Sequence, residues 1–171
     1  MLHHRPSLPV KTLFLFRHAK SSWAEQGLQD IDRGLNARGI RDAYDTALWL
    51  KQKGVSTECM VSSPADRALH TATIISRTLG IPFSTLQLDA KLYEAHPSDI
   101  EEVVCALPKL IDTAMLFGHN PGMPLFVNQC VQERIDHFPT SSVACIRFDS
   151  ASWIDRNGPA ELLFMSAPKL R

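Results

Sequence analysis

An arginine and a histidine stand side by side where an apolar run near the start of the chain ends. The run 13–16 leads directly into Arg17 and His18, after which the sequence becomes polar. A short apolar run predicts a buried strand. Cationic side chains are costly to bury unless a negative charge accompanies them. We therefore expect a bound anion to supply the charge that these two side chains lack.

Two other predicted strands are also followed by a basic side chain within a few residues. The strand predicted over 58–63 ends in two serines and a proline, and Arg67 follows in the first turn of the next helix. The strand predicted over 112–117 runs into the segment GHNPG (118–122), which contains His119. Carboxyl ends of parallel strands share one edge of a sheet. If these strands are neighbours, two arginines, two histidines and two helix N-termini converge there.

This set of groups suits a small dianion such as a phosphoryl group. The guanidinium fork of arginine matches pairs of phosphate oxygens, and a helix N-terminus offers backbone N–H donors. A neutral imidazole can carry a covalent phosphoryl group, and a second histidine can bind the phosphoryl oxygens in the transition state. Nearby arginines lower the pKa of a histidine below about 6.5 and keep it neutral at pH 7. The chain has no HxH, HExxH or carboxylate cluster suited to a metal, and we expect neither a metal nor another cofactor.

Four motifs in order resemble the histidine phosphatase superfamily, which includes the phosphoglycerate mutase-like enzymes, and within it the short phosphohistidine phosphatases called SixA. The motifs are RHAKSSW (17–23), DRGLNARG (32–39), SSPADRALHTA (62–72) and GHNPG (118–122). The superfamily has glycine after Arg-His, where this chain has alanine, as in SixA-like sequences. The resemblance covers about residues 12 to 148.

The resemblance implies a role for each matching residue. His18 corresponds to the phosphorylated nucleophile, and Arg17, Arg67 and His119 correspond to the rest of the phosphate pocket. The segment LYEAHP (92–97) matches the region where larger relatives carry the acid that protonates the leaving group, which nominates Glu94. Two further residues beside these motifs are candidates for phosphate binding, Ser21 and Asn120.

The substrate is open between two phosphorylated classes. The insertions that recognise sugar phosphates in larger relatives are absent, so we expect a shallow site that suits phosphohistidine on a signalling protein, such as a histidine-containing phosphotransfer domain. A small phosphate ester is the alternative substrate, and Glu94 matters more there because an alkoxide leaving group needs a proton. A third alternative is a non-catalytic module that binds phosphoproteins.

Composition excludes several other classes of protein. The 171 residues carry 18 basic and 18 acidic side chains, and this balance does not indicate a nucleic-acid partner. No apolar run approaches the ~18 residues that a membrane helix needs. The four cysteines are scattered and are expected to be free thiols in a reducing compartment, so we expect a cytoplasmic protein. Residues 1–10 are expected to form a tail, and 11–171 a single domain.

Alternating strand and helix patterns predict an α/β fold that positions these residues. Strands are expected over 11–16, 58–63, 112–117, 142–148 and 160–166, with a weaker one within 82–88. Helical periodicity is found over 36–54, 63–80, 98–110 and 120–131, with Ser63, Ser98 and Asn120 as the first residues of the last three. The pattern predicts three layers, α/β/α, around a mostly parallel sheet of about six strands. The dipeptide Asn157-Gly158 predicts a terminal hairpin whose last strand is an antiparallel edge.

Overall fold

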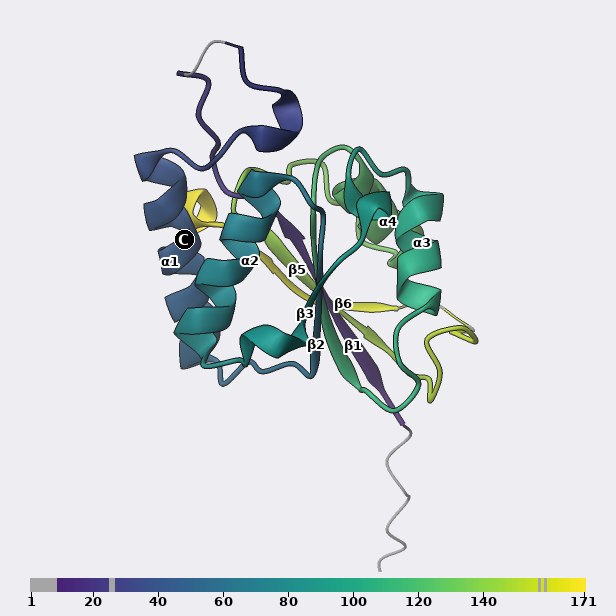
Figure 1. Cartoon of the computed structure of the whole chain (residues 1–171). Coiled ribbons are helices and arrows are strands. Elements are labelled where there is room, and N and C mark those ends of the chain that lie inside the picture. The colour runs from purple at the N-terminus through teal and green to yellow at the C-terminus, as the bar shows by residue number, and fades with distance from the viewer. Residues whose placement is uncertain (1–8, 25–26, 157, 159) are drawn as a thin grey trace, which may run out of the picture.

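The computed structural model of the chain has a six-stranded mixed sheet with helices on both faces (Figure 1). The structure describes residues 9–24, 27–156, 158 and 160–171. The strands are β1 (Lys11–Arg17), β2 (Cys59–Ser62), β3 (Leu86–Leu88), β4 (Thr113–Gly118), β5 (Val143–Phe148) and β6 (Glu161–Ser166). Most of the expected tail, residues 1–8, lies outside the described residues, as does Asn157 of the hairpin signal.

The strand order is β3-β2-β4-β1-β5-β6, which places the three site-bearing strands β2, β4 and β1 next to one another. β4 is parallel to both β1 and β2, so their carboxyl ends lie at one edge. β5 is antiparallel to β1, and β6 is antiparallel to β5. The expected hairpin with an edge strand antiparallel to its neighbour is confirmed, and the one difference is which strand runs against the parallel ones. The antiparallel strand is the internal β5, and the edge strand β6 runs in the same direction as β1.

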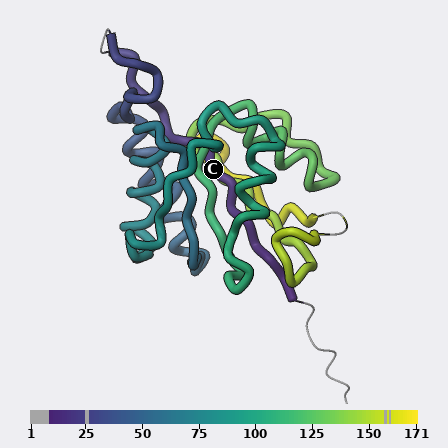
Figure 2. Tube along the Cα trace, turned by 45° about the vertical axis from the view of Figure 1, so that its right-hand side comes forward, coloured from purple at the N-terminus to yellow at the C-terminus, as the bar shows by residue number. Residues whose placement is uncertain are grey.

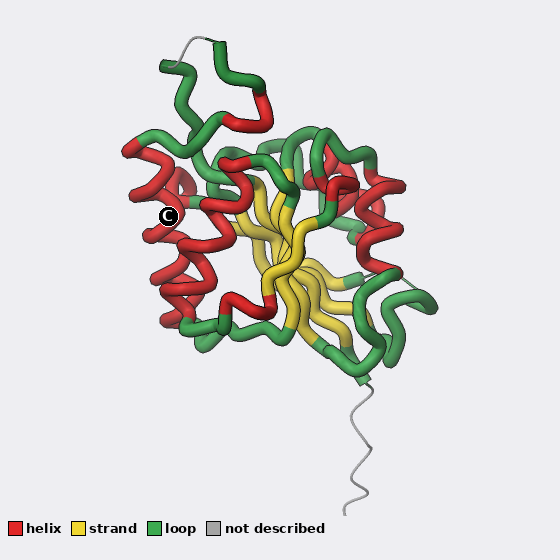
Figure 3. The backbone as a smooth tube through the Cα atoms, in the orientation of Figure 1, coloured by secondary structure: helices red, strands yellow, loops and turns green. Residues whose placement is uncertain are grey.

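Helices cover the two faces of the sheet in pairs (Figures 1 and 3). The helices α1 (Ala37–Gln52) and α2 (Asp66–Leu79) lie on one face, and α3 (Pro97–Cys105) and α4 (Gly122–Cys130) lie on the other. Side chains of β1 alternate between the two cores. Leu13 and Leu15 join the core beneath α3 and α4, whereas Phe14 and Phe16 join the core beneath α1 and α2. Burial on both faces explains why β1 reads as a continuous apolar run. The predicted α/β/α arrangement is confirmed.

Three predicted helix starts differ from the structure. α2 begins at Asp66 after Ala65, α3 begins at Pro97 after His96, and α4 begins at Gly122 after Pro121. The side chains expected to cap two of these helices have other partners: Ser63 contacts His119, and Asn120 contacts the carbonyl of Phe138. α1 begins at Ala37, within the predicted helical segment 36–54, and the side chain of Asn36 caps it by accepting a hydrogen bond from the backbone N–H of Gly39.

The described residues 20–24 and 27–36, called here the projecting loop, extend from the edge of the sheet where the parallel strands end (Figure 2). It carries the short 3-10 helix η1 (Asp30–Asp32). Three more 3-10 turns are η2 (Phe83–Thr85), η3 (Ala90–Leu92) and η4 (Pro168–Leu170). The weak strand expected within 82–88 is reduced to the three residues of β3, because η2 occupies the start of that segment.

Candidate active site

The two histidines meet because β1 and β4 are paired in register. Arg17 lies opposite Gly118 at the last rung of that ladder, and the backbone N–H of His18 donates to the carbonyl of Gly118 at 3.0 Å. The next residue after Gly118 is His119, and its ring centroid is 5.0 Å from that of His18, with the planes inclined at 53°. The strand ends thus place two buried imidazoles against each other.

The ring of His18 is held in a single orientation by a backbone carbonyl. Its Nδ1 lies 2.7 Å from the carbonyl oxygen of Ala19, which can only accept, so Nδ1 carries the proton in the neutral ring. The lone pair of the neutral ring is then on Nε2. Burial, reinforced by the charges of Arg67, Arg17 and Arg33, lowers the pKa of His18 to about 4. At neutral pH His18 is therefore an uncharged imidazole with a free nucleophilic nitrogen.

His119 is also neutral at physiological pH. Burial, together with the charges of His18 and Arg67, lowers its pKa to about 3. Its Nε2 lies 2.8 Å from the hydroxyl oxygen of Ser63, which comes directly after β2. The ring of Tyr93 packs edge-on against it at 5.5 Å. Among the described residues, nothing hydrogen-bonds the buried Nδ1 of His119. One polar nitrogen beside His18 is thus left without a protein partner.

Arg67 lies in the first turn of α2 and is only 6% exposed. Both terminal nitrogens of its guanidinium donate to Asp30 of the projecting loop, one to the backbone carbonyl and the other to Oδ2 at 2.7 Å. Asp30 also accepts from Arg33 at 2.6 Å and from the hydroxyl of Tyr93 at 3.0 Å. Partial burial acts to raise the pKa of Asp30, but the hydrogen bonds from Arg67, Tyr93 and Arg33 outweigh it and bring the pKa to about 2. Any anion that contacts the terminal nitrogens of Arg67 would have to share them with this carboxylate or displace it.

Arg17 has a different environment from Arg67. One terminal nitrogen donates to the carbonyl of Phe138 at 2.9 Å, and the side-chain Nε is buried with no partner in the described part of the chain. In those same residues, no carboxylate forms an ion pair with Arg17. Its positive charge is therefore available to a ligand.

Two predicted phosphate ligands contact other protein groups. The amide of Asn120 donates to the carbonyl of Phe138 at 3.0 Å, which is the same carbonyl that Arg17 contacts. The hydroxyl of Ser21 accepts from Arg33 at 2.7 Å. Both residues therefore brace groups around the pocket, and their direct contact with phosphate stays a prediction.

Glu94, the predicted acid, is exposed in the segment that follows η3. Its φ of 51° is in the left-handed region, which is uncommon for a residue other than glycine. The segment packs tightly against GHNPG: a Cβ on Gly122 would overlap the carbonyl oxygen of Ala95, and one on Gly118 would lie 3.3 Å from that of Leu92. Glu94 is therefore held near the histidines by its backbone, while its role as an acid stays a prediction.

The sequence patterns did not single out Asp30 or Tyr93. Asp30 precedes the motif DRGLNARG by two residues, in a loop without hydrophobic periodicity, and Tyr93 reads as an ordinary apolar residue beside Glu94. The one available signal was the spacing of Asp30 and Arg33, an acid and a base three residues apart. Among the described residues, no group of three or more histidine, cysteine or acidic side chains could hold a metal ion.

Comparisons with known proteins agree with this geometry. The family model of the histidine phosphatase superfamily (branch 1) matches residues 13–134. An uncharacterized protein of Mycobacterium tuberculosis, Rv1276c, is 30% identical over 164 residues, which cover 90% of this chain and 99% of the relative. A 2,3-bisphosphoglycerate-dependent phosphoglycerate mutase of Borrelia garinii is 36% identical over 86 residues, 49% of this chain and 35% of the mutase.

Solved structures extend the likeness to the whole fold. A structure from Agrobacterium tumefaciens that is named as a phosphohistidine phosphatase SixA superposes with a TM-score of 0.80 at 26% identity. The superposition covers 92% of this chain and 98% of the Agrobacterium chain. A SixA solved with tungstate has the same TM-score, 0.80, at 22% identity, over 92% and 97% of the two chains, and shows the shared fold. The fold is therefore phosphoglycerate mutase-like. The family match over 13–134, with Arg17, His18, Arg67 and His119 in their predicted order, shows that this chain belongs to the histidine phosphatase superfamily.

Proposed function

We propose that this protein is a phosphatase that works through a covalent phosphohistidine on Nε2 of His18. The observation that carries the proposal is the neutral imidazole of His18, whose Nδ1 is committed to the carbonyl of Ala19 at 2.7 Å, leaving the lone pair on Nε2. Buried His119 lies beside it, and the charge of buried Arg67 acts on it. This is a preorganised nucleophile next to groups that stabilise negative charge.

The reaction has two steps. The lone pair of Nε2 attacks phosphorus, the bond from phosphorus to the leaving atom breaks, and the leaving group takes a proton. Water then attacks the phosphoryl group on His18, the N–P bond breaks, and inorganic phosphate leaves with His18 neutral again. Arg17 and Arg67 hold the phosphoryl oxygens, and His119 hydrogen-bonds them as charge develops. The scheme uses only side chains and water.

We propose phosphohistidine on a signalling protein as the substrate. Two features support this: the SixA-like motifs, and the likeness to a SixA structure over nearly the full length of both chains. The leaving group is then an imidazole nitrogen, which solvent can protonate, so the enzyme needs no strong acid of its own. An unidentified phosphoprotein is the expected partner.

A small phosphate ester is the second candidate. The identity shared with a phosphoglycerate mutase favours it, as does the placement of Glu94 on a constrained segment packed against GHNPG. An ester needs a proton at its leaving oxygen, and Glu94 is the proposed donor.

Rapid-quench labelling with ³²P-phosphohistidine tests the proposal. Wild type should accumulate an acid-labile phosphoprotein, and His18→Ala should lose the label together with at least about 10³-fold of kcat/KM. His70→Ala is the matched control, because His70 is an exposed histidine on α2 outside the proposed machinery. Label that persists in His18→Ala would disprove the nucleophile. Tight phosphate binding with neither label nor turnover would instead indicate a phosphoprotein-binding module.

A further inference from the structure

A second cationic depression adjoins the phosphate pocket. The cavity has a volume of about 210 Å³, and no carboxylate is among the residues that line it. We name this cavity the basic groove, and its lining residues are Arg17, Lys20, Arg38, His137, Pro139, Thr140 and Lys169. Arg17 belongs to both sites, so a molecule whose phosphoryl group reaches His18 has its neighbouring atoms beside the groove.

Four separate parts of the chain build the basic groove. They are the end of β1 with Lys20 just after it, Arg38 in the first turn of α1, the segment 137–140 before β5, and Lys169 in η4. Because β5 is antiparallel to β1, its N-terminal end lies at the same edge of the sheet, and the backbone N–H of Arg17 donates to the carbonyl of Ser142 at 3.0 Å. The groove therefore lies toward β5, whereas His119 lies on the β4 side of β1.

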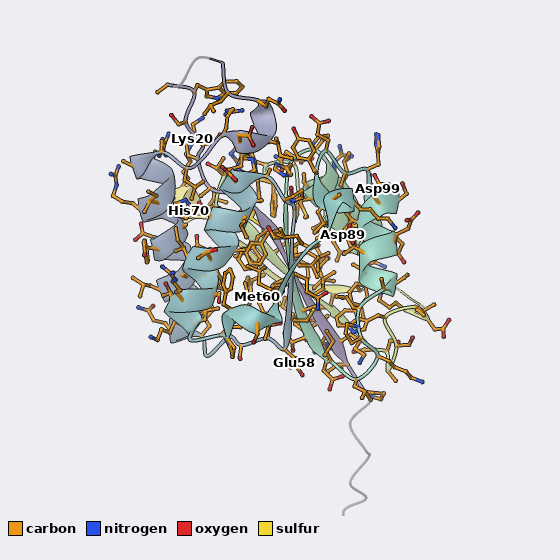
Figure 4. The ribbon with its side chains drawn as sticks, in the orientation of Figure 1. Lys20, Glu58, Met60, His70, Asp89 and Asp99 are labelled. Atoms are coloured by element: carbon orange, nitrogen blue, oxygen red, sulfur yellow. The ribbon has the colours of Figure 1, made fainter. Side chains whose placement is uncertain are left out.

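The start of the projecting loop is tied to α1. A Cβ on Gly39 would overlap the carbonyl oxygen of Lys20, so this glycine lets the two backbones touch. Figure 4 shows Lys20 beside the end of α1 from which the loop projects, and Glu58 at the opposite end of the sheet. The cations of the groove are thus set at the same edge as the catalytic histidine.

The basic groove concentrates positive charge in a protein whose net charge is zero. Among the described residues, Arg38 is the one groove cation with an ion pair, to Asp42 at 3.5 Å. Like charges placed together repel one another, and an anionic ligand relieves that repulsion. The groove therefore has the electrostatic character of an anion-binding surface.

The side chains of the groove suit a protein surface better than a second phosphate. Arg67, in the phosphate pocket, is 6% exposed and fixed by hydrogen bonds, whereas Lys20, Arg38 and Lys169 are all exposed. Exposed, flexible cations match carboxylates spread over a surface. The loop that begins at Lys20 also presents Trp23, which is 76% exposed and stacked on the guanidinium of Arg33 at 3.2 Å. An exposed aromatic ring held in place is typical of a protein contact.

We propose that the basic groove binds carboxylate side chains that flank the phosphohistidine on the protein substrate. The inference rests on the proposed function and adds a specificity rule to it: an acidic surface beside the phosphorylated histidine favours hydrolysis. Attraction between opposite charges acts on encounter and orientation, so the effect appears in kcat/KM and weakens as salt screens it.

Two synthetic peptides test this rule. Each carries one phosphohistidine, flanked by glutamates in one peptide and by the isosteric glutamines in the other. Wild type should hydrolyse the glutamate peptide with about tenfold higher kcat/KM at low salt, since one pair of opposite charges at ~6 Å in water contributes about threefold. The ratio of kcat/KM for the glutamate peptide to that for the glutamine peptide should approach one in the double variant Lys20→Glu, Lys169→Glu. Lys51→Glu is the control, because Lys51 is exposed on α1 about 20 Å along the helix from Arg38.

The outcomes separate this inference from the proposed function. A ratio near one in wild type, or a ratio that the double variant leaves unchanged, would overturn the groove assignment while the phosphatase proposal stands. If neither phosphopeptide is hydrolysed, the groove assignment is tested by binding alone, measured as the fluorescence anisotropy of a labelled hexaglutamate peptide. The groove assignment is supported if the double variant binds this peptide about tenfold more weakly than wild type and Lys51→Glu binds it as wild type does. Equal binding by all three proteins, or none by wild type, refutes it.

Discussion

Lowering the pH from 7 to 5 should leave His18 almost entirely neutral. A histidine with an ordinary pKa of about 6.5 is only about 3% neutral at pH 5. Burial and the neighbouring arginines lower the pKa of His18 to about 4, and at pH 5 a group with that pKa is about 90% neutral. The two cases differ about thirtyfold in the amount of nucleophile, which a measurement can separate easily.

Nuclear magnetic resonance of the imidazole Cε1–H groups measures this pKa without a substrate. The resonance lost in His18→Gln identifies His18, and it should stay at its neutral position from pH 8 to pH 5. The rate of phosphoenzyme formation, corrected for ionisation of the substrate, should fall less than twofold between pH 7 and pH 5. A His18 titration centred near pH 6.5 would refute the argument that burial and arginine charges keep this ring neutral.

The same shift links His18 to the stability of the fold. Its pKa is about 4 in the folded protein and about 6.5 when unfolded, so the unfolded chain binds more protons between these values. The contribution of His18 to stability is therefore complete above pH 6.5 and is lost as the pH falls toward 4. His18→Gln should flatten the dependence of the urea midpoint on pH within that window.

Three further predictions concern the surroundings of the pocket. Glu94→Gln should slow hydrolysis of an alkyl phosphate more than that of phosphohistidine, and equal slowing of both would count against an acid role. Asp30→Asn should lower the inhibition constant for inorganic phosphate about threefold, because it removes a negative charge next to Arg67. Weaker inhibition by phosphate would instead show that Asp30 chiefly positions Arg67. Gly122→Ala should lower the free energy of unfolding, measured by urea denaturation, by about 1–3 kcal/mol, because the added Cβ meets a backbone carbonyl. Gly34→Ala is the control and should be nearly neutral, because its Cβ would have nothing within 4 Å. Equal stabilities of the two variants would contradict the packing argument.

The convergence of Arg17, His18, Arg67 and His119 could be predicted because it depends on strands. Strand ends are marked by a change from apolar to polar residues, and parallel strands bring their carboxyl ends to one edge. The ladder between β1 and β4 then fixes His18 beside His119 with no help from loop structure. The antiparallel pairing of β5 with β1 was not specified by the sequence, because a hairpin signal indicates only that β5 and β6 are antiparallel to each other.

The partners of these side chains could not be predicted, because they come from segments without periodicity. Asp30 reaches Arg67 from the projecting loop, and the hydroxyl of Ser63 contacts His119 instead of capping α2. Hydrogen bonds of this kind depend on loop conformation, which apolar spacing does not encode. The consequence is chemical as well as structural. In the proposed site, the strands position the groups that would bind a phosphoryl group, and the loop supplies the competing carboxylate. Asp30 already occupies the guanidinium of Arg67, whereas the charge of Arg17 has no carboxylate among its described neighbours.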